Sequence, residues 1–251
     1  MGVEPALKLV VGVYGVLVAV TFGLWVVHIK NAQQAWVHDF GERLKSWWCV
    51  NTTIGFILIS RDRMGCLIFA VLLVISILEI WKTRPNDSSL MGSAALSLIV
   101  ASAFAPVCII LFRGETFERA LLCLAILLTQ LNDIYQYCVG RALGRRALAP
   151  RISPSKTIEG AMGGILLTAV TSLCVAPLVT QRESFLAISL GIGVGVLGIC
   201  GDLAYSVVKR RRGIKDFGSL LPGQGGLLDR LDSLTLVVPA LFLLMIVSGL
   251  I

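Results

Sequence analysis

Long apolar stretches alternate with short polar connections along almost the whole chain. A helix needs about 20 mostly apolar residues to cross a bilayer. The pattern predicts such spans at 8–27, 64–81, 90–112, 118–138, 159–179, 185–208 and 233–251. The stretch 47–60 is shorter and polar in its middle, so it fits a tilted span, a re-entrant piece or an interfacial segment. The predicted fold class is therefore all-α, a polytopic bundle of seven or eight transmembrane helices.

The composition supports a membrane protein. Of the 251 residues, 56% are hydrophobic and 15% are charged, whereas a soluble domain has about 45–50% and about 25%. The first apolar run lacks an early basic region and a clear cleavage site, so we interpret it as a retained anchor rather than a signal peptide. Seven scattered cysteines without a CxxC pair and two isolated histidines predict neither a disulfide framework nor a zinc site.

The charge pattern predicts the orientation. The formal net charge of +7 suits an anionic leaflet and anionic substrates, and we expect no nucleic-acid partner. Half of the cations lie in two connections, 139–158 and 209–231, which two predicted spans separate. Both connections therefore lie on one side, which the positive-inside rule makes cytoplasmic. That rule alone explains much of the excess charge, but the short connections place any chemistry at this face of the membrane.

Several carboxylates lie where a spanning helix should be apolar, which makes each a candidate for function. Glu79 is close to Lys82 in the sequence, and an interfacial ion pair is its simpler interpretation. Asp202 shares one helix face with Ser206 and Lys209, which predicts a polar stripe leading into the second basic connection.

Five aspartates are predicted near the cytoplasmic face, where lysines and arginines are also frequent: Asp133, Asp202, Asp216, Asp229 and Asp232. Singly, each could neutralise a neighbouring cation. Together they favour a divalent cation with a polyphosphate, because carboxylates supply the hard oxygen ligands of Mg²⁺ and basic side chains bind phosphate oxygens. We therefore expect Mg²⁺ as the cofactor, with room for a second cation.

Two further segments fit phosphate binding. In PGQGG, Gly225 and Gly226 allow a tightly bent backbone whose N–H groups can approach a ligand. In ISPSKTIEG, hydroxyl groups, an ammonium group and free N–H groups precede a helix that is predicted to start near Glu159. Ordinary capping by Ser155 or Thr157 explains the same residues. SPSKT lacks the glycines of a Walker A loop.

The second basic connection resembles the signature of the phosphatidate cytidylyltransferases, also called CDP-diacylglycerol synthases. The family pattern S-x-x-K-R-x₄-K-D-x-G-x₂-L-P-x-H-G-G-L-x-D-R-L-D is matched at every position but one, since Gln224 stands where the family has histidine. The matching residues are Ser206, Lys209, Arg210, Lys215, Asp216, Gly218, Leu221, Pro222, Gly225, Gly226, Leu227, Asp229, Arg230, Leu231 and Asp232. Upstream, NDIYQY and SPSKTIEG are similar to the family's preceding segment, in a bacterial paralogue branch with an NDxxQY motif. The resemblance covers 126–240 well.

The resemblance implies a reaction of CTP with phosphatidate that gives CDP-diacylglycerol and pyrophosphate. It implies metal binding by Asp133, Asp202, Asp229 and Asp232, and catalytic roles for Lys209, Lys215, Asp216, Gln224 and Arg230. The substrate contacts that it implies are Ser153, Ser155, Lys156, Thr157, Ser206, Arg210, Gly225 and Gly226. We also expect a multi-pass protein of a bacterial inner membrane, with weakly similar helices at 1–125 and a catalytic region at 126–251. Assembly as a homo-oligomer is left open.

Gln224 leaves a second interpretation open. Glutamine donates and accepts hydrogen bonds, but it cannot carry a positive charge or act as a general acid or base near neutral pH. The alternative to an active enzyme is therefore a relative that binds nucleotide or lipid without turnover. A membrane transporter fits less well, because the polar groups cluster at one face and no matching pair of broken helices is evident.

Overall fold

The computed structural model describes Trp48, Thr52 and residues 64–84, 90–114, 116–178, 184–220 and 225–250. Most of these residues are helical. The helices are α3 (Met64–Lys82), α4 (Leu90–Arg113), α5 (Thr116–Leu143), α6 (Ile158–Val175), α7 (Ser184–Arg211), α8 (Leu228–Leu231) and α9 (Leu234–Val247). A hairpin of β1 (Ala147–Ala149) and β2 (Ser153–Thr157) joins α5 to α6, and the 3-10 turn Ala176–Leu178 follows α6.

Five of these helices, α3 to α7, are long and apolar enough to cross a membrane. They confirm the predicted polytopic helical bundle, and all five begin within two residues of the predicted spans. The hairpin is a small departure from an all-α fold. The run at 8–27 and nearly all of 47–60 lie outside the described residues.

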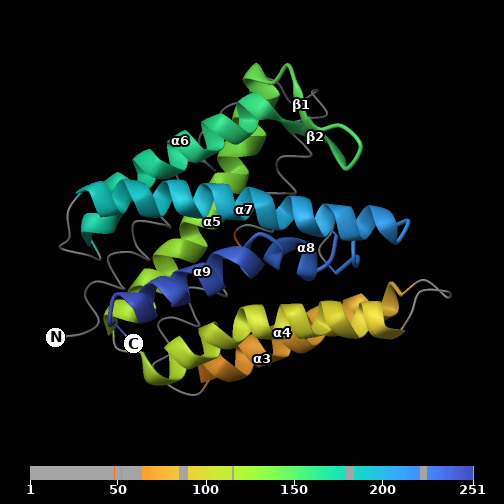
Figure 1. The fold of residues 1–251 in the computed structure, drawn as a ribbon, viewed down its shortest axis with the longest axis horizontal. Helices are drawn as coiled ribbons and strands as arrows, with labels where there is room; N and C mark the ends of the chain where they lie inside the picture. The colour runs from red at the N-terminus through yellow and green to blue at the C-terminus, as the bar shows by residue number, and fades with distance from the viewer. Residues whose placement is uncertain are drawn as a thin grey trace.

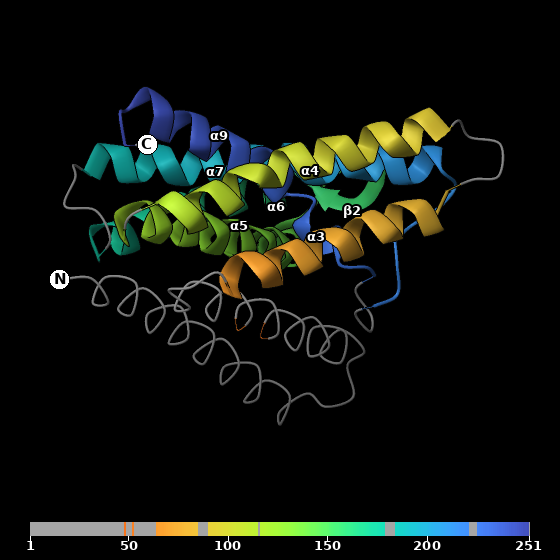
Figure 2. The same ribbon diagram turned by 90° about the horizontal axis from the view of Figure 1, so that it is seen from below.

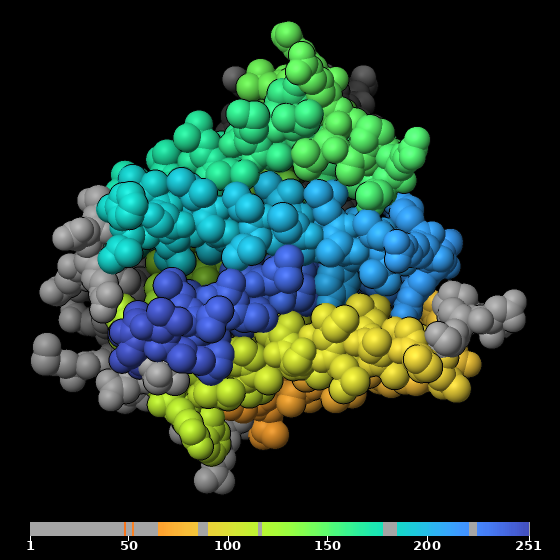
Figure 3. All heavy atoms as spheres, viewed as in Figure 1, coloured from red at the N-terminus to blue at the C-terminus, as the bar shows by residue number. Residues whose placement is uncertain are grey.

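Helix α5 lies at the centre of the described bundle and contacts α4, α6, α7 and α9. Helices α6 and α7 run antiparallel beside it, and α3 packs on α4 (Figures 1 and 2). In the space-filling view, α7 crosses the molecule between α6 on one side and α9 on the other (Figure 3). The start of α6 and the end of α7 therefore lie at the same end of the bundle, as predicted for the two basic connections.

Glycines end two of the helices. Gly213 follows α7 with φ +69°, and the N–H of Ile214 donates to the carbonyl of Lys209 at 3.0 Å. Gly249, also with φ +69°, ends α9 in the same way. This is the Schellman arrangement, in which glycine takes the left-handed conformation that other residues avoid. Helix α9 is therefore only 14 residues long, shorter than the span predicted at 233–251.

The SPSKT segment forms a strand, which its residue pattern does not indicate. Strand β2 pairs antiparallel with β1, with Thr157 opposite Ala147. Thr157 also caps α6, because its Oγ1 accepts a hydrogen bond from the N–H of Gly160 at 3.0 Å. The predicted capping by Thr157 is confirmed, and the helix begins at Ile158, next to the predicted start.

A buried polar network joins three helices. Asn132 of α5 is fully buried, and its Nδ2 donates to the carbonyl of Gly195 in α7 at 3.4 Å. Its Oδ1 accepts from Oγ1 of Thr168 in α6 at 3.3 Å. Buried polar groups are stable when they satisfy one another in this way. The network therefore connects the helices that carry most of the pocket described below.

Close packing of α6 and α7 depends on a glycine. A Cβ added to Gly191 would lie 2.6 Å from Cα of Ala169 and 2.9 Å from the carbonyl oxygen of Thr168. We expect Gly191→Ala to reduce the free energy of unfolding by about 1–3 kcal/mol through overpacking. Gly193→Ala is the matched control, because no atom lies within 4 Å of a Cβ added there.

Thermal unfolding in detergent, followed by circular dichroism, checks this pair of variants. Gly193→Ala should match or slightly exceed the wild type, because alanine has the higher helix propensity. Equal midpoints for the two variants would contradict the close approach of α6 and α7.

Candidate active site

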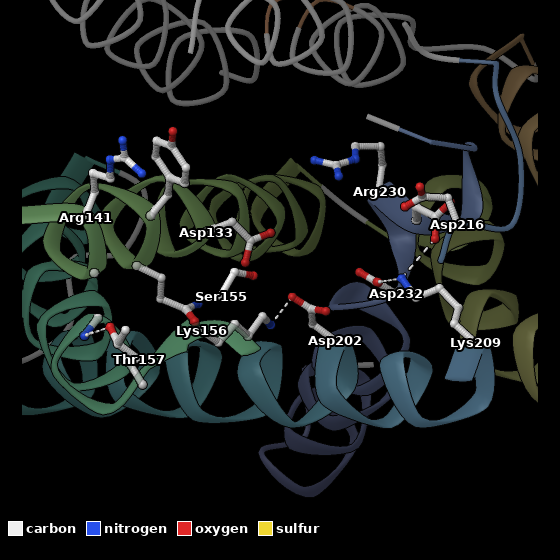
Figure 4. Close-up of a pocket in the computed structure, with 16 residues that line it drawn as sticks. Asp133, Arg141, Ser155, Lys156, Thr157, Asp202, Lys209, Asp216, Arg230 and Asp232 are labelled. Atoms are coloured by element: carbon white, nitrogen blue, oxygen red, sulfur yellow. Dashed lines mark hydrogen bonds and ion pairs between the residues drawn. The ribbon is translucent and has the colours of Figure 1, made fainter. Parts of the chain in front are cut away.

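A pocket of about 560 Å³ brings together charged side chains from α5, the hairpin, α7 and the segment around α8 (Figure 4). The volume is in the range of small-molecule sites. Its lining consists of Asp133, Gln136, Tyr137, Gly140, Arg141, Ser155, Lys156, Thr157, Gly160, Ala161, Asp202, Lys209, Asp216, Asp229, Arg230 and Asp232. Ten of the predicted site residues therefore meet in one cavity, although they come from segments far apart in the sequence.

Lys156 and Asp202 form an ion pair across the pocket. The ammonium group of Lys156 on β2 contacts Oδ2 of Asp202 on α7. The other oxygen, Oδ1, accepts a hydrogen bond from Ser206, one helical turn further on, at 3.3 Å. This confirms that Asp202 and Ser206 share one face of the helix. Asp133 points into the same space from α5 (Figure 4).

Lys209 lies between two carboxylates of the α8 segment. Its Nζ is 2.9 Å from Oδ1 of Asp229 and 3.5 Å from Oδ2 of Asp232, and its side chain is only 10% exposed. Burial, together with repulsion by Asp202, raises the pKa of Asp232, which lies at the end of α8. Positive charge close to Asp232 therefore stabilises the carboxylate form of this residue.

Asp229 organises the backbone between α7 and α8. Its Oδ2 accepts the N–H groups of Phe217 and Gly226, both at 2.8 Å, while Oδ1 accepts from Lys209. Gly225 has φ +86°, and an added Cβ there would lie 2.7 Å from the same Oδ2. One oxygen of Asp229 accepts two backbone N–H groups from separate segments, which favours an organising role over the metal-binding role that the resemblance implies.

Glu79 has a different environment from the one predicted. The expected ion pair with Lys82 is absent from the described part of the chain. The buried carboxylate of Glu79 instead accepts the N–H groups of Leu227 and Leu228, each at 2.9 Å, across 148 and 149 residues of sequence. Lys82 is exposed. No local pattern around Glu79 indicates this contact, since the acceptor and the donors lie in distant segments.

Six predicted site residues do not line the pocket: Ser153, Ser206, Arg210, Lys215, Gly225 and Gly226. Arg210 donates to the carbonyl of Ile152 at 3.0 Å and to that of Ile214 at 3.1 Å, so it holds the hairpin against the end of α7. Lys215 is exposed. Gln224 lies outside the described residues.

Six other residues line the pocket and were not predicted as site residues: Gln136, Tyr137, Gly140, Arg141, Gly160 and Ala161. The first four lie three, four, seven and eight residues after Asp133 on α5, so helical periodicity places them on the face of Asp133. That spacing could have identified them from the sequence. The other two follow Thr157 in the first turn of α6 and carry no chemical signal.

The oxygen donors of the pocket suit Mg²⁺. Asp133 and Asp202 both repel the carboxylate of Asp232. Among the described residues, however, no three side chains of Asp, Glu, His or Cys gather closely enough to hold a metal ion. Mg²⁺ commonly takes only one or two carboxylates and completes its shell with water and substrate phosphates. The donor set therefore fits Mg²⁺ that is held jointly with a phosphate ligand.

The sequence is similar to known proteins over most of its length. The model of the "Cytidylyltransferase family" matches residues 8–248. A protein named phosphatidate cytidylyltransferase from Brucella abortus biovar 1 (strain 9-941) is 35% identical over 237 residues, which are 92% of this chain and 84% of that protein. A protein of the same name from Haemophilus influenzae (strain KW20 / Rd) is 34% identical over 218 residues, 81% of this chain and 73% of that protein.

A third relative is similar over a shorter region. "Uncharacterized protein YnbB" of Escherichia coli (strain K12) is 48% identical over 124 residues, 49% of this chain and 42% of that protein. The family model nevertheless covers all described helices of this chain, and five charged residues of the signature segment line the pocket: Lys209, Asp216, Asp229, Arg230 and Asp232. The chain belongs to the cytidylyltransferase family.

Proposed function

We propose that the protein is a CTP:phosphatidate cytidylyltransferase, which makes CDP-diacylglycerol and pyrophosphate. The family and the names of the relatives support this reaction. The observation that carries the proposal is that Lys156, Asp202 and Arg230 meet in one pocket from a strand, a spanning helix and the α8 segment. Cations beside carboxylates fit two phosphate-bearing substrates and a divalent cation.

In the proposed reaction, a phosphate oxygen of phosphatidate attacks the α-phosphorus of CTP in line. A phosphorus–oxygen bond forms while the bond from the α-phosphorus to the bridging oxygen breaks, and pyrophosphate leaves with the electron pair. No side-chain nucleophile is required. The chain contributes by orienting the two phosphate groups and by neutralising charge. Lys156 and Arg230 face the pocket and are proposed to bind phosphate oxygens.

Three carboxylates are proposed to hold Mg²⁺ together with substrate oxygens: Asp133, Asp202 and Asp232. When bound, the ion would neutralise part of the negative charge of the triphosphate. The hydroxyl groups of Ser155 and Thr157 also line the pocket and are proposed to donate hydrogen bonds to phosphate.

We place the reaction at the cytoplasmic face of a bacterial inner membrane. The spanning helices anchor the protein in the bilayer that contains the lipid substrate. Exposed arginines on the hairpin side, such as Arg145, Arg146 and Arg151, agree with a cytoplasmic location by the positive-inside rule.

The direct test is a product assay. Purified protein in detergent is incubated with phosphatidate, radiolabelled CTP and Mg²⁺, and we expect labelled CDP-diacylglycerol. Asp202→Asn should lower kcat on the order of a hundredfold, because it removes charge from the centre of the pocket. Ser189→Ala, on an exposed position of the same helix, is the matched control and should retain wild-type activity. Equal activity of the two variants would contradict the assignment of the pocket.

The same assay with Gln224→His decides whether the chain is an active enzyme or a relative without turnover. Product from the wild type supports the proposed reaction. Product from Gln224→His but not from the wild type would establish the inactive alternative. Lipid or ion flux that does not depend on nucleotide would favour a transporter.

A further inference from the structure

We propose that Glu79 is a positioning residue that anchors the segment bearing Asp229, Arg230 and Asp232. The effect on catalysis rests on the proposed function, whereas the anchoring itself concerns the folded protein alone. Glu79 lies in α3, in the part of the chain where the resemblance to the family signature is weak. The inference therefore makes an N-terminal helix part of the catalytic arrangement.

The first observation is that each carboxylate oxygen of Glu79 accepts a backbone hydrogen bond. Oε1 of Glu79 accepts the N–H of Leu227 and Oε2 accepts the N–H of Leu228, both at 2.9 Å. The first N–H groups of a helix have no partner within the helix, and α8 consists of only four residues. A carboxylate is the stronger type of acceptor for such groups. Both donors are buried, so loss of this acceptor would leave them unsatisfied.

The second observation is that two glycines leave the space for this carboxylate. A Cβ added to Gly226 would lie 2.5 Å from Oε2 of Glu79, and one added to Gly218 would lie 2.6 Å from Oε1. Neither glycine has a positive φ, so backbone conformation does not require glycine at these positions. Glycine is required at both positions because a side chain there would collide with the carboxylate of Glu79.

The third observation is a second contact between α3 and the connection from α7 to α8. Arg212, just after α7, donates from NH1 to the carbonyl of Ile80 at 3.0 Å and from NH2 to Oγ of Ser93 in α4 at 3.3 Å. The ring of Phe217 is contacted by the cations of both Arg212 and Lys209, at 5.8 and 5.9 Å from its centroid. The end of α3 is therefore attached to both sides of the connection from α7 to α8.

The consequence for the pocket follows from sequence proximity. Leu227 and Leu228 directly precede Asp229, whose carboxylate binds Lys209 and the two backbone N–H groups described above. Arg230 lies one residue further and lines the pocket. A shift of this short helix would move all of these groups together. The hydrogen bonds of Glu79 go to backbone N–H groups, so Glu79 acts through the backbone that carries the pocket residues.

The test uses Glu79→Gln in the full-length protein. The amide keeps the shape of the side chain, but its NH₂ group faces a backbone donor instead of accepting from it. We expect faster hydrogen–deuterium exchange in peptides that cover 225–231, and a loss of kcat on the order of a hundredfold. The control is Lys82→Gln on the same helix, which should change neither quantity. If an ion pair between Glu79 and Lys82 were the important contact, both variants would behave alike, and the proposal would be overturned.

A double-mutant cycle separates positioning from general destabilisation. Gly226→Ala alone should reduce activity, because its methyl group collides with the Glu79 carboxylate. In a Glu79→Ala background the same methyl group enters vacated space, so the double variant should be no worse than Glu79→Ala alone. Such non-additivity is expected for residues in contact and not for distant, independent sites. Additive losses would contradict the proposed contact.

The hydrogen–deuterium exchange measurement also shows which of the two proposals is wrong if one of them fails. A wild type that forms no CDP-diacylglycerol would refute the proposed function, while faster exchange at 225–231 in Glu79→Gln would still support the anchoring. Unchanged exchange in Glu79→Gln would refute the anchoring, whatever the activity of the wild type.

Discussion

Lys209→Met is expected to cost about 3–5 kcal/mol of the free energy of unfolding, the usual penalty for breaking a buried ion pair from one side. The side chains of Asp229 and Asp232 are only 2% and 6% exposed, and Lys209 is their cationic partner in the structure. Without it, the two buried carboxylates would lose the cation that lies between them. We expect a large drop in the thermal midpoint in detergent and no measurable cytidylyl transfer.

Arg211→Met is the control for this prediction. Arg211 lies two residues further on α7, is exposed, and loses the same charge on substitution. It should unfold within about 0.5 kcal/mol of the wild type, as surface substitutions usually do. Adding Asp229→Asn and Asp232→Asn to Lys209→Met should recover part of the stability. A midpoint for Lys209→Met equal to that of Arg211→Met would show that the buried ion pair is not important for stability.

Gly225→Ala is expected to abolish activity. The residue has φ +86°, where a side chain costs about 1–2 kcal/mol, and the added Cβ would lie 2.7 Å from Oδ2 of Asp229 and 2.9 Å from Cβ of Asp216. Either the backbone turns or Asp229 moves, and each change disturbs the hydrogen bonds that Asp229 makes with Phe217 and Gly226. The measurement is cytidylyl transfer together with the thermal midpoint.

Gly213→Ala isolates the contribution of the backbone. It has φ +69°, but no atom lies within 4 Å of an added Cβ. This variant should lose only the energy of the strained backbone and keep most of its activity. If both glycine variants were equally active, the contact between Gly225 and Asp229 would not matter for the site.

The bundle was predictable because the physical requirement is simple. A span needs length and apolarity, and both can be counted along the chain, as the agreement for α3, α4 and α7 illustrates. The extent of α9 was wrong because Gly249, inside an apolar run, adopts a positive φ and ends the helix. Hydropathy does not contain that information. The β1–β2 hairpin was missed because strands of three and five residues have too few positions to show an alternating pattern.

The candidate site was predictable where local spacing decides the geometry. Asp202 and Ser206 share a face because they are one turn apart, and Asp229 and Asp232, three residues apart, both lie close to Lys209. The roles of Glu79 and Asp229 were not predictable, because each depends on which backbone N–H groups the tertiary fold brings within reach. A carboxylate that binds backbone looks the same in a sequence as one that binds metal.

The hydrogen bonds of Asn132 fix how far α5, α6 and α7 are shifted along their axes relative to one another. Asp133 is the next residue on α5, and Asp202 lies seven residues, or two turns, after Gly195 on α7. If one helix slid past another by a single turn, it would move by about 5.4 Å. The hydrogen bonds of Asn132 oppose this movement, because the side-chain amide would then have no partner in the apolar interior. Transmembrane helices tilt when the thickness of the bilayer changes. Because Asn132 joins α5, α6 and α7 at one depth, we expect these helices to tilt together, so that the separation of Asp133 and Asp202 stays the same in membranes of different thickness.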